Sequence, residues 1–277
     1  SSHASTTTTD TKPLDVVLVL DASGSMADPM GNGDTTKCIT ALQNAVNAFI
    51  DNTAKKNKEI ADENKRIRLS IVKFSGNENT TTGNSTYRDG GYTYNYSQIM
   101  QGLTVCEGAA VNTLKSNVNA IKPAGATRAD NGMKRAQAAL ASARENAKKV
   151  VIFFTDGSPN NSNGFDDRIA AKTVETAKSL KDAGAEVYTV GIFSGAKPAA
   201  SVTSEWTSSE NKFMHAVSSN YPKAAYTSNG WYYSWNFGDR PYNANYYLAA
   251  SNANELNKVF NSIFGSITRN LAGPTEV

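Results

Sequence analysis

The stretch Asp15-Val-Val-Leu-Val-Leu-Asp-Ala-Ser-Gly-Ser-Met26 carries the strongest fold signal in the chain. Its residues 16–20 are continuously apolar and include β-branched Val, a pattern typical of a strand buried on both faces of a parallel sheet. Asp21, Ser23 and Ser25 follow at once on a short turn that contains a glycine. The stretch therefore predicts a central strand that ends in a cluster of oxygen-bearing side chains.

Strand and helix patterns alternate along the rest of the chain. The expected strands cover residues 66–74, 98–105, 149–155, 186–193 and 246–249, and the expected helices cover residues 39–50, 111–121, 133–147, 167–183 and 254–267. The helices are assigned from apolar residues that recur at helical spacing. This alternation predicts an α/β fold: a doubly wound, mostly parallel central sheet with helices on both faces.

We expect a single domain with two long insertions. The expected division is a flexible flank at 1–12, one domain at 13–270 and a C-terminal flank at 271–277. The insertions lie at about 75–97 and 194–245, and the second contains a short helix near 205–217. Both leave the sheet at the carboxyl edge of its strands, where Asp21 is expected. Loops of this length inside a compact domain are usually functional.

Aromatic residues are concentrated in both insertions, together with Ser, Gly and Asn. Binding surfaces favour this mixture, because aromatic rings give a large contact area at a low entropy cost. The alternative is that these rings only pack the insertions against the domain. The candidates for a ligand surface are Tyr92, Tyr94, Trp231, Tyr232 and Trp235.

The composition excludes several classes of function. The net charge is +3, from 28 basic and 25 acidic residues spread along the chain, so we expect no nucleic-acid interface. No apolar run approaches the ~20 residues that a membrane span requires. His3 and His215 lie outside any ligand spacing, and no nucleophile with a His and an Asp can be assembled, so we expect no enzyme.

Two further oxygen clusters are expected at the same sheet edge as Asp21. Thr127 precedes a helix in Gly-Ala-Thr127, and Asp156 ends a buried strand in Thr-Asp156-Gly-Ser. Each cluster alone has an ordinary alternative, namely a helix cap or a turn. Together, carboxylates and hydroxyls suit Mg²⁺, Mn²⁺ or Ca²⁺ rather than zinc or copper.

These three segments resemble the metal-ion-dependent adhesion site of the von Willebrand factor A family. The resemblance implies five metal ligands, in three loops: Asp21, Ser23 and Ser25, then Thr127, then Asp156. It implies Mg²⁺ as the expected ion, with Mn²⁺ or Ca²⁺ as alternatives. It also implies an open coordination position that a Glu or Asp carboxylate of a partner fills, so the metal mediates adhesion.

The paired insertions resemble those of the A-domains of pilus tip adhesins from Gram-positive bacteria. This resemblance implies an extracellular place at the bacterial cell surface or pilus tip. The implied partners are a host or matrix protein, alternatively a glycan, and other pilus subunits. A second hypothesis is an intracellular assembly module that partners an ATPase or another protein complex.

Three residues outside the five ligands need an interpretation. Cys38 and Cys106 lie in polar surroundings near element boundaries, which favours a disulfide over two buried thiols. A disulfide also fits an oxidising, extracytoplasmic setting. Asp130 either orients Thr127 or a water from a second shell, or stabilises the start of a helix; we favour the second role.

Overall fold

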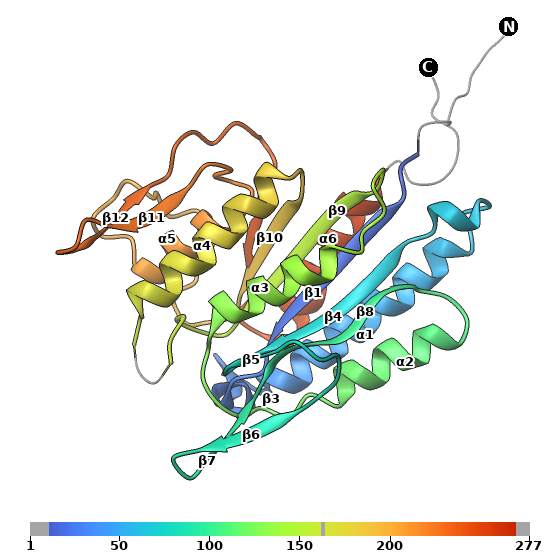
Figure 1. Ribbon diagram of the computed structural model, residues 1–277, viewed down its shortest axis with the longest axis horizontal. Coiled ribbons are helices and arrows are strands. Elements are labelled where there is room, and N and C mark those ends of the chain that lie inside the picture. The colour runs from blue at the N-terminus through green and yellow to red at the C-terminus, as the bar shows by residue number, and fades with distance from the viewer. Residues whose placement is uncertain (1–10, 162–163, 270–277) are drawn as a thin grey trace, which may run out of the picture.

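The fold is built around one seven-stranded sheet (Figure 1). This computed structural model describes residues 11–161 and 164–269. The strand order is β13-β10-β9-β1-β4-β8-β5. The strands are β1 (Leu14–Asp21), β4 (Arg68–Phe74), β5 (Glu78–Asn79), β8 (Ser97–Val105), β9 (Lys148–Thr155), β10 (Glu186–Gly191) and β13 (Tyr247–Ala249).

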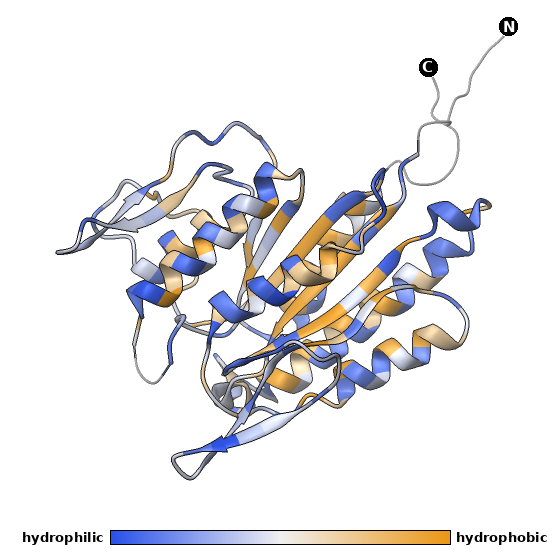
Figure 2. Ribbon diagram, in the orientation of Figure 1, coloured by the Kyte–Doolittle hydropathy of each residue, from blue (hydrophilic) through white to orange (hydrophobic). Residues whose placement is uncertain are grey.

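The central strands are parallel. β1 pairs in parallel with β4 and β9, β9 with β10, and β10 with β13, whereas β8 runs antiparallel to β4. All eight residues of β1 are buried, because the strand has neighbours on both sides and helices on both faces. Figure 2 shows the apolar colour concentrated in these strands. The predicted α/β fold with a mostly parallel sheet is confirmed.

Helices cover both faces of the sheet. One face carries α1 (Cys38–Asn57), α2 (Ala109–Asn119) and α6 (Ala253–Thr268), and the other carries α3 (Ala129–Leu140), α4 (Asp167–Asp182) and α5 (Ser209–Val217). Short 3-10 turns occur at η1 (Gly24–Ala27) and η2 (Glu63–Lys65). Each helix buries one apolar stripe against the sheet, as the periodicity predicts.

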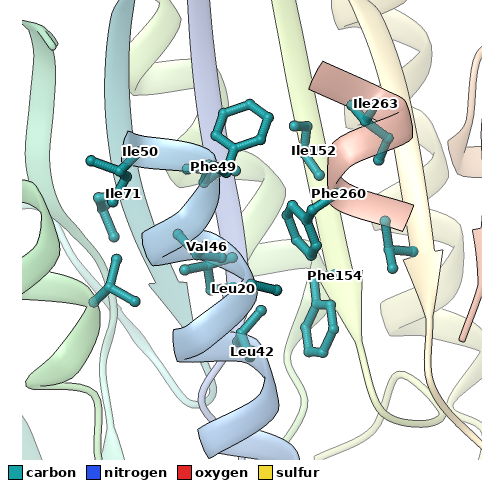
Figure 3. Close-up of a cluster of buried hydrophobic side chains, with 14 of the residues drawn as sticks. Leu20, Leu42, Val46, Phe49, Ile50, Ile71, Ile152, Phe154, Phe260 and Ile263 are labelled. Atoms are coloured by element: carbon teal, nitrogen blue, oxygen red, sulfur yellow. The ribbon is translucent and has the colours of Figure 1, made fainter. Parts of the chain in front are cut away.

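The core beneath α1 and α6 is shown in Figure 3. Phe49 of α1 meets Phe260 of α6 edge to face, with ring centroids 6.2 Å apart. Leu20 of β1 lies in the same cluster and is fully buried. Each such side chain contributes roughly 1.5–3 kcal/mol through burial. The core therefore anchors β1 directly below the loop that begins after Asp21.

The helix predicted at 133–147 is shorter than expected. It begins earlier and ends at Leu140. Beyond that point Arg144 donates its backbone N–H to Oδ2 of Asp15, at 2.8 Å, and its guanidinium pairs with the same buried carboxylate. This tertiary contact draws the chain off the helix axis, so it outweighs the helix propensity of the alanines.

The two insertions form regular structure. The first contains β5 and a hairpin of β6 (Thr86–Asp89) and β7 (Tyr92–Asn95). The second contains α5 and a ribbon of β11 (Ala225–Ser228) and β12 (Tyr233–Asn236). A further hairpin, β2 (Pro29–Gly31) with β3 (Asp34–Lys37), follows η1. In Figure 1 the β6–β7 hairpin and the β11–β12 ribbon project from the body of the molecule.

The expected Cys38–Cys106 disulfide is wrong: both cysteines are free and buried. Cys38 is the first residue of α1, whereas the Cys106 thiol donates to the carbonyl of Ile50 on the same helix. Ile50 lies twelve positions after Cys38 in the helix, which is about 18 Å at the α-helical rise. A disulfide requires Cα atoms within about 7 Å of each other, so the two thiols are too far apart.

Among the helices of the described residues, none combines the length and the apolar character that crossing a membrane requires.

Candidate metal site

The site lies where β1 ends, between β4 and β9. The chain leaves β1 toward β4 on one side, and the later strands β9 and β10 extend the sheet on the other. Such a reversal of strand order opens a crevice at the carboxyl ends of the strands. Asp21 is the last residue of β1, and Asp156 directly follows the last residue of β9.

Backbone contacts hold the first and second loops together. Gly24 donates its N–H to the carbonyl of Gly125 at 3.1 Å, and Ala124 donates to the carbonyl of Ala22 at 2.9 Å. Gly125 has a φ of +105°, and a Cβ there would lie 2.5 Å from Oγ of Ser75. Only glycine allows this approach, so the second loop can pass close to the first.

The Asp21 carboxylate forms hydrogen bonds with both the first and the third loop. It is fully buried. Its Oδ1 accepts the N–H of Ser23 at 2.8 Å, and its Oδ2 accepts the hydroxyl of Thr155 at 2.9 Å and the N–H of Asp156 at 3.3 Å. One carboxylate thus fixes the backbone of the first and third loops.

The predicted ligands of the first and third loops meet side chain to side chain. Ser25 donates its hydroxyl to Oδ2 of Asp156 at 2.7 Å, and the hydroxyl oxygens of Ser23 and Ser25 are 3.2 Å apart. Thr127 is buried and is held beside the third loop by two backbone hydrogen bonds with Asn160, of 2.9 and 3.0 Å. The fold therefore brings all three predicted loops to one place.

The electrostatics of the site favour a cation. Burial, and after it the negative charge of Asp21, raises the pKa of Asp156 to about 8. Oδ1 of Asp156 is buried and has no hydrogen-bond partner among the described residues. A buried carboxylate oxygen without a partner is costly, and a cation would relieve both this cost and the repulsion between the two carboxylates.

The donor set fits a hard divalent cation. Its members are carboxylate and hydroxyl oxygens, which Mg²⁺, Mn²⁺ and Ca²⁺ prefer. The described residues contain no group of three or more His, Cys, Asp or Glu side chains that could hold a metal. The five ligand assignments remain predictions.

Asp130 lies next to the site but is bound to another residue. It is buried in the first turn of α3, and its carboxylate accepts two hydrogen bonds from the guanidinium of Arg128, at 3.0 and 2.9 Å. This pairing, more than any other contact, raises the pKa of Arg128. This position in the first turn of α3 agrees with the favoured role, which is to stabilise the start of the helix. The sequence did not indicate the ion pair with Arg128.

The five aromatic candidates divide into two groups. Tyr92, Trp231 and Tyr232 are exposed, by 72%, 89% and 65%. Tyr94 instead stacks on Tyr87 with ring centroids 5.3 Å apart, and Trp235 stacks on Tyr226 at 3.9 Å. Tyr94 and Trp235 therefore pack within the insertions, as the alternative interpretation of the aromatic residues predicts.

Two exposed aromatic residues were missing from those candidates: Tyr242, which is 50% exposed, and Trp206. Trp206 is 89% exposed, as much as Trp231. It lies in the second insertion, before α5. Its signal in the sequence is a lone tryptophan between Ser, Glu and Thr residues, away from the tyrosine-rich part of the insertion.

Comparison with known proteins identifies the type of domain. A sequence model of the von Willebrand factor type A domain matches residues 15–224, a range that includes all five predicted ligands. No curated protein matches the sequence.

Several solved structures share the fold. The PilB minor pilin of Streptococcus sanguinis has a TM-score of 0.60 at 15% identity, over 94% of this chain and 62% of that one. The pilus adhesin SpaC of Lactobacillus rhamnosus GG, in an open conformation, has a TM-score of 0.59 at 16% identity, over 94% of this chain and 30% of that one.

The vWF domain of the type V pili tip protein Mfa5 from Porphyromonas gingivalis has a TM-score of 0.58 at 14% identity, over 96% of this chain and 98% of that one. At these identities the likeness shows the fold. The chain spans under two thirds of the PilB chain and under one third of the SpaC chain.

Proposed function

We propose, from the premise that the chain belongs to the von Willebrand factor type A family, that it is a metal-ion-dependent adhesion module and not an enzyme. The observation that carries the proposal is the hydrogen bond from the Ser25 hydroxyl to Oδ2 of Asp156. The other carboxylate oxygen of Asp156, Oδ1, is buried without a hydrogen-bond partner among the described residues. A cation bound at this place would be an electrophilic group to which an oxygen of the partner can bind.

The chain's own residues have separate tasks in this proposal. Ser23 and Ser25 hold the ion directly, whereas Asp21, Thr127 and Asp156 hold it directly or through water. Mg²⁺ is the proposed ion, with Mn²⁺ and Ca²⁺ as alternatives. Because most of the donors are neutral hydroxyls, the ion keeps much of its positive charge. It therefore attracts an acidic group, a Glu or Asp carboxylate of the partner.

We place the chain at the bacterial cell surface, at a pilus tip. The support is its fold likeness to a minor pilin, a pilus adhesin and a pilus tip protein. The proposed partners are a host or matrix protein and, through other parts of a longer protein, further pilus subunits. The exposed rings of Tyr92, Trp231 and Tyr232 are the proposed contact residues beyond the metal.

The direct test is metal and ligand binding by the purified chain. Calorimetric titration with Mg²⁺, Mn²⁺ and Ca²⁺ measures the ion, and binding to immobilised collagen, fibronectin and fibrinogen with and without EDTA measures adhesion. The Ser23→Ala variant loses both activities. Ser116→Ala, at an exposed position of α2, is the matched control and keeps both. Adhesion that survives EDTA and Ser23→Ala would overturn the metal-centred function.

The free cysteines leave an intracellular assembly module as a second candidate function. Without a disulfide between Cys38 and Cys106, the redox argument for export no longer applies, and an intracellular assembly module remains the alternative. Protease shaving of intact cells separates the two: a surface protein is removed, whereas an intracellular one is protected.

A further inference from the structure

A polar pocket lies directly beside the third metal loop. Its volume is about 560 Å³. Gly157 and Ser158, which follow Asp156, form one wall. The other walls come from the end of β10 and from the second insertion, including Trp206, whose ring is 89% exposed. A ligand that touches the metal would reach this pocket next.

The pocket is linked to the metal loop by a hydrogen bond. Ser158 donates its hydroxyl to Oε2 of Glu210, at 2.5 Å. Glu210 lies in the first turn of α5, whose N-cap is Ser208. The third loop and the start of α5 therefore form one wall of fixed shape.

A buried asparagine makes the pocket rigid. Oδ1 of Asn211 accepts the N–H of Lys197 at 2.8 Å and the hydroxyl of Tyr247 at 2.7 Å. Its Nδ2 donates to the carbonyl of Gly195 and to Oγ of Ser208, both at 2.9 Å. All the polar atoms of this side chain are used inside the protein. The pocket is therefore preorganised, which lowers the entropy cost of binding.

The charges in the pocket are balanced. Lys197 and Glu210 both line it, and in the described part of the chain neither side chain forms an ion pair. For a cationic guest the attraction of Glu210 is offset by the repulsion of Lys197, and for an anionic guest the two effects are exchanged, so the pocket favours neither sign of charge. A neutral guest rich in hydroxyls can instead take charge-assisted hydrogen bonds from one side chain and give them to the other.

We propose that this pocket binds a neutral sugar ring of a glycan ligand. The face of an indole carries negative charge density, and the C–H face of a pyranose presents weakly positive hydrogens to it. Trp206 stacks on that face, while Lys197 and Glu210 bond to the ring hydroxyls. The inference rests on the proposed adhesion function and names its ligand class: a glycan, or the sugar of a glycoprotein, that also presents an acidic group to the metal.

The test uses defined methyl pyranosides of glucose, galactose, mannose and N-acetylglucosamine. Saturation-transfer NMR detects weak binding and shows which ring protons face the protein. We expect at least one pyranoside to bind with its C–H face toward the protein. Trp206→Ala weakens this binding about tenfold or more. Tyr242→Ala is the control, since Tyr242 is another exposed aromatic residue of the second insertion, at 50%, and does not line the pocket. It leaves the binding unchanged.

Several outcomes would overturn the inference: no pyranoside binds, Trp206→Ala and Tyr242→Ala lose binding equally, or the protein binds N-acetylarginine amide through Trp206 in preference to every sugar. The last result would assign the pocket to a basic peptide side chain.

Running the same titrations in Mg²⁺ and in EDTA separates this inference from the proposed function. The monosaccharide contact is independent of the metal. Mg²⁺ binding without sugar binding contradicts only the pocket, and sugar binding without Mg²⁺ binding contradicts only the metal site.

Discussion

The hydroxyl of Ser25 donates a 2.7 Å hydrogen bond to Oδ2 of Asp156, across 131 positions of sequence. The contact exists because β1 and β9 are neighbours in the sheet and end at the same edge. It joins a neutral donor to a carboxylate whose other oxygen is buried without a partner among the described residues. The behaviour of this pair with and without a cation is the basis of the first two predictions.

Divalent metal is expected to stabilise the fold. An ion that binds only the native state stabilises it by about 2.7 kcal/mol at a concentration of 100 times its Kd. Mg²⁺ therefore raises Tm in a thermal melt, and EDTA reverses the rise. Ser25→Ala reduces the effect, and Ser116→Ala does not. A Tm that is insensitive to Mg²⁺, Mn²⁺ and Ca²⁺ would contradict the site.

Asp156→Asn is expected to stabilise the metal-free protein at neutral pH while abolishing metal binding. The folded pKa of Asp156 is raised from 3.8 to about 8, so the native state holds a proton that the unfolded state has lost. Stability therefore falls as pH rises from about 4 to 8, by up to about 1.4 kcal/mol per pH unit. Urea unfolding in EDTA between pH 6.5 and 8 measures this slope, which Asp156→Asn removes.

His215 is expected to make the protein less stable as the pH falls, which is the opposite of the effect of Asp156. His215 is fully buried, and burial lowers its pKa to about 4. Its Nε2 lies 2.9 Å from the carbonyl of Pro198, and its Nδ1 lies 3.1 Å from Nδ2 of Asn220. Because Oδ1 of Asn220 accepts from Tyr246, Nδ2 must point at the ring. This environment fits the neutral imidazole.

The His215 ring of the unfolded state therefore binds a proton below about pH 6.5, whereas the ring of the native state stays neutral down to about pH 4. We expect a loss of roughly 3 kcal/mol over that range. Urea unfolding in the Asp156→Asn background isolates this slope. His215→Gln flattens it, and an unchanged slope in that variant would show that another group titrates.

Asn95→Ala is expected to destabilise the protein and weaken metal binding together. Oδ1 of Asn95 accepts from the fully buried Lys73 ammonium at 3.0 Å, and its Nδ2 donates to the carbonyls of Ala22 and Lys122, at 3.0 and 2.7 Å. Its removal takes one of three acceptors from the buried Lys73 ammonium and one donor from each of the two carbonyls, at a cost of about 3 kcal/mol. Chemical unfolding and Mg²⁺ titration measure the two effects. Asn112→Ala, at an exposed position of α2, is the control and changes neither.

Both cysteines are expected to react slowly with thiol reagents in the native state. Burial is the main cause that raises the pKa of Cys38 to about 11 and of Cys106 to about 12. Little thiolate is therefore present at neutral pH. Denaturation without reductant should release two reactive thiols per chain. A count of zero would restore the disulfide that the structure contradicts.

Local patterns in the sequence were enough for the central strands and for the place of the predicted site. The run from Val16 to Leu20 is apolar at every position, which is the pattern of a strand buried on both faces in the middle of a sheet. Asp21 then has to lie at the carboxyl edge, since it ends that strand. The same reasoning places Asp156 at the end of β9.

Other features depended on contacts between distant segments. Arg144 ends α3 early because Asp15, 129 residues away, accepts its backbone N–H. Cys38 and Cys106 stay apart because opposite ends of α1 hold them.

Sequence periodicity reports which face of an element is buried, because this depends on neighbours along the chain. It therefore determined the strands, most of the helices and the order of the three loops. It does not report which distant side chain completes a contact, because that depends on how whole elements pack. The bond from Ser25 to Asp156, the ion pair of Asp130 and the pocket beside Trp206 were decided only when the sheet brought their segments together.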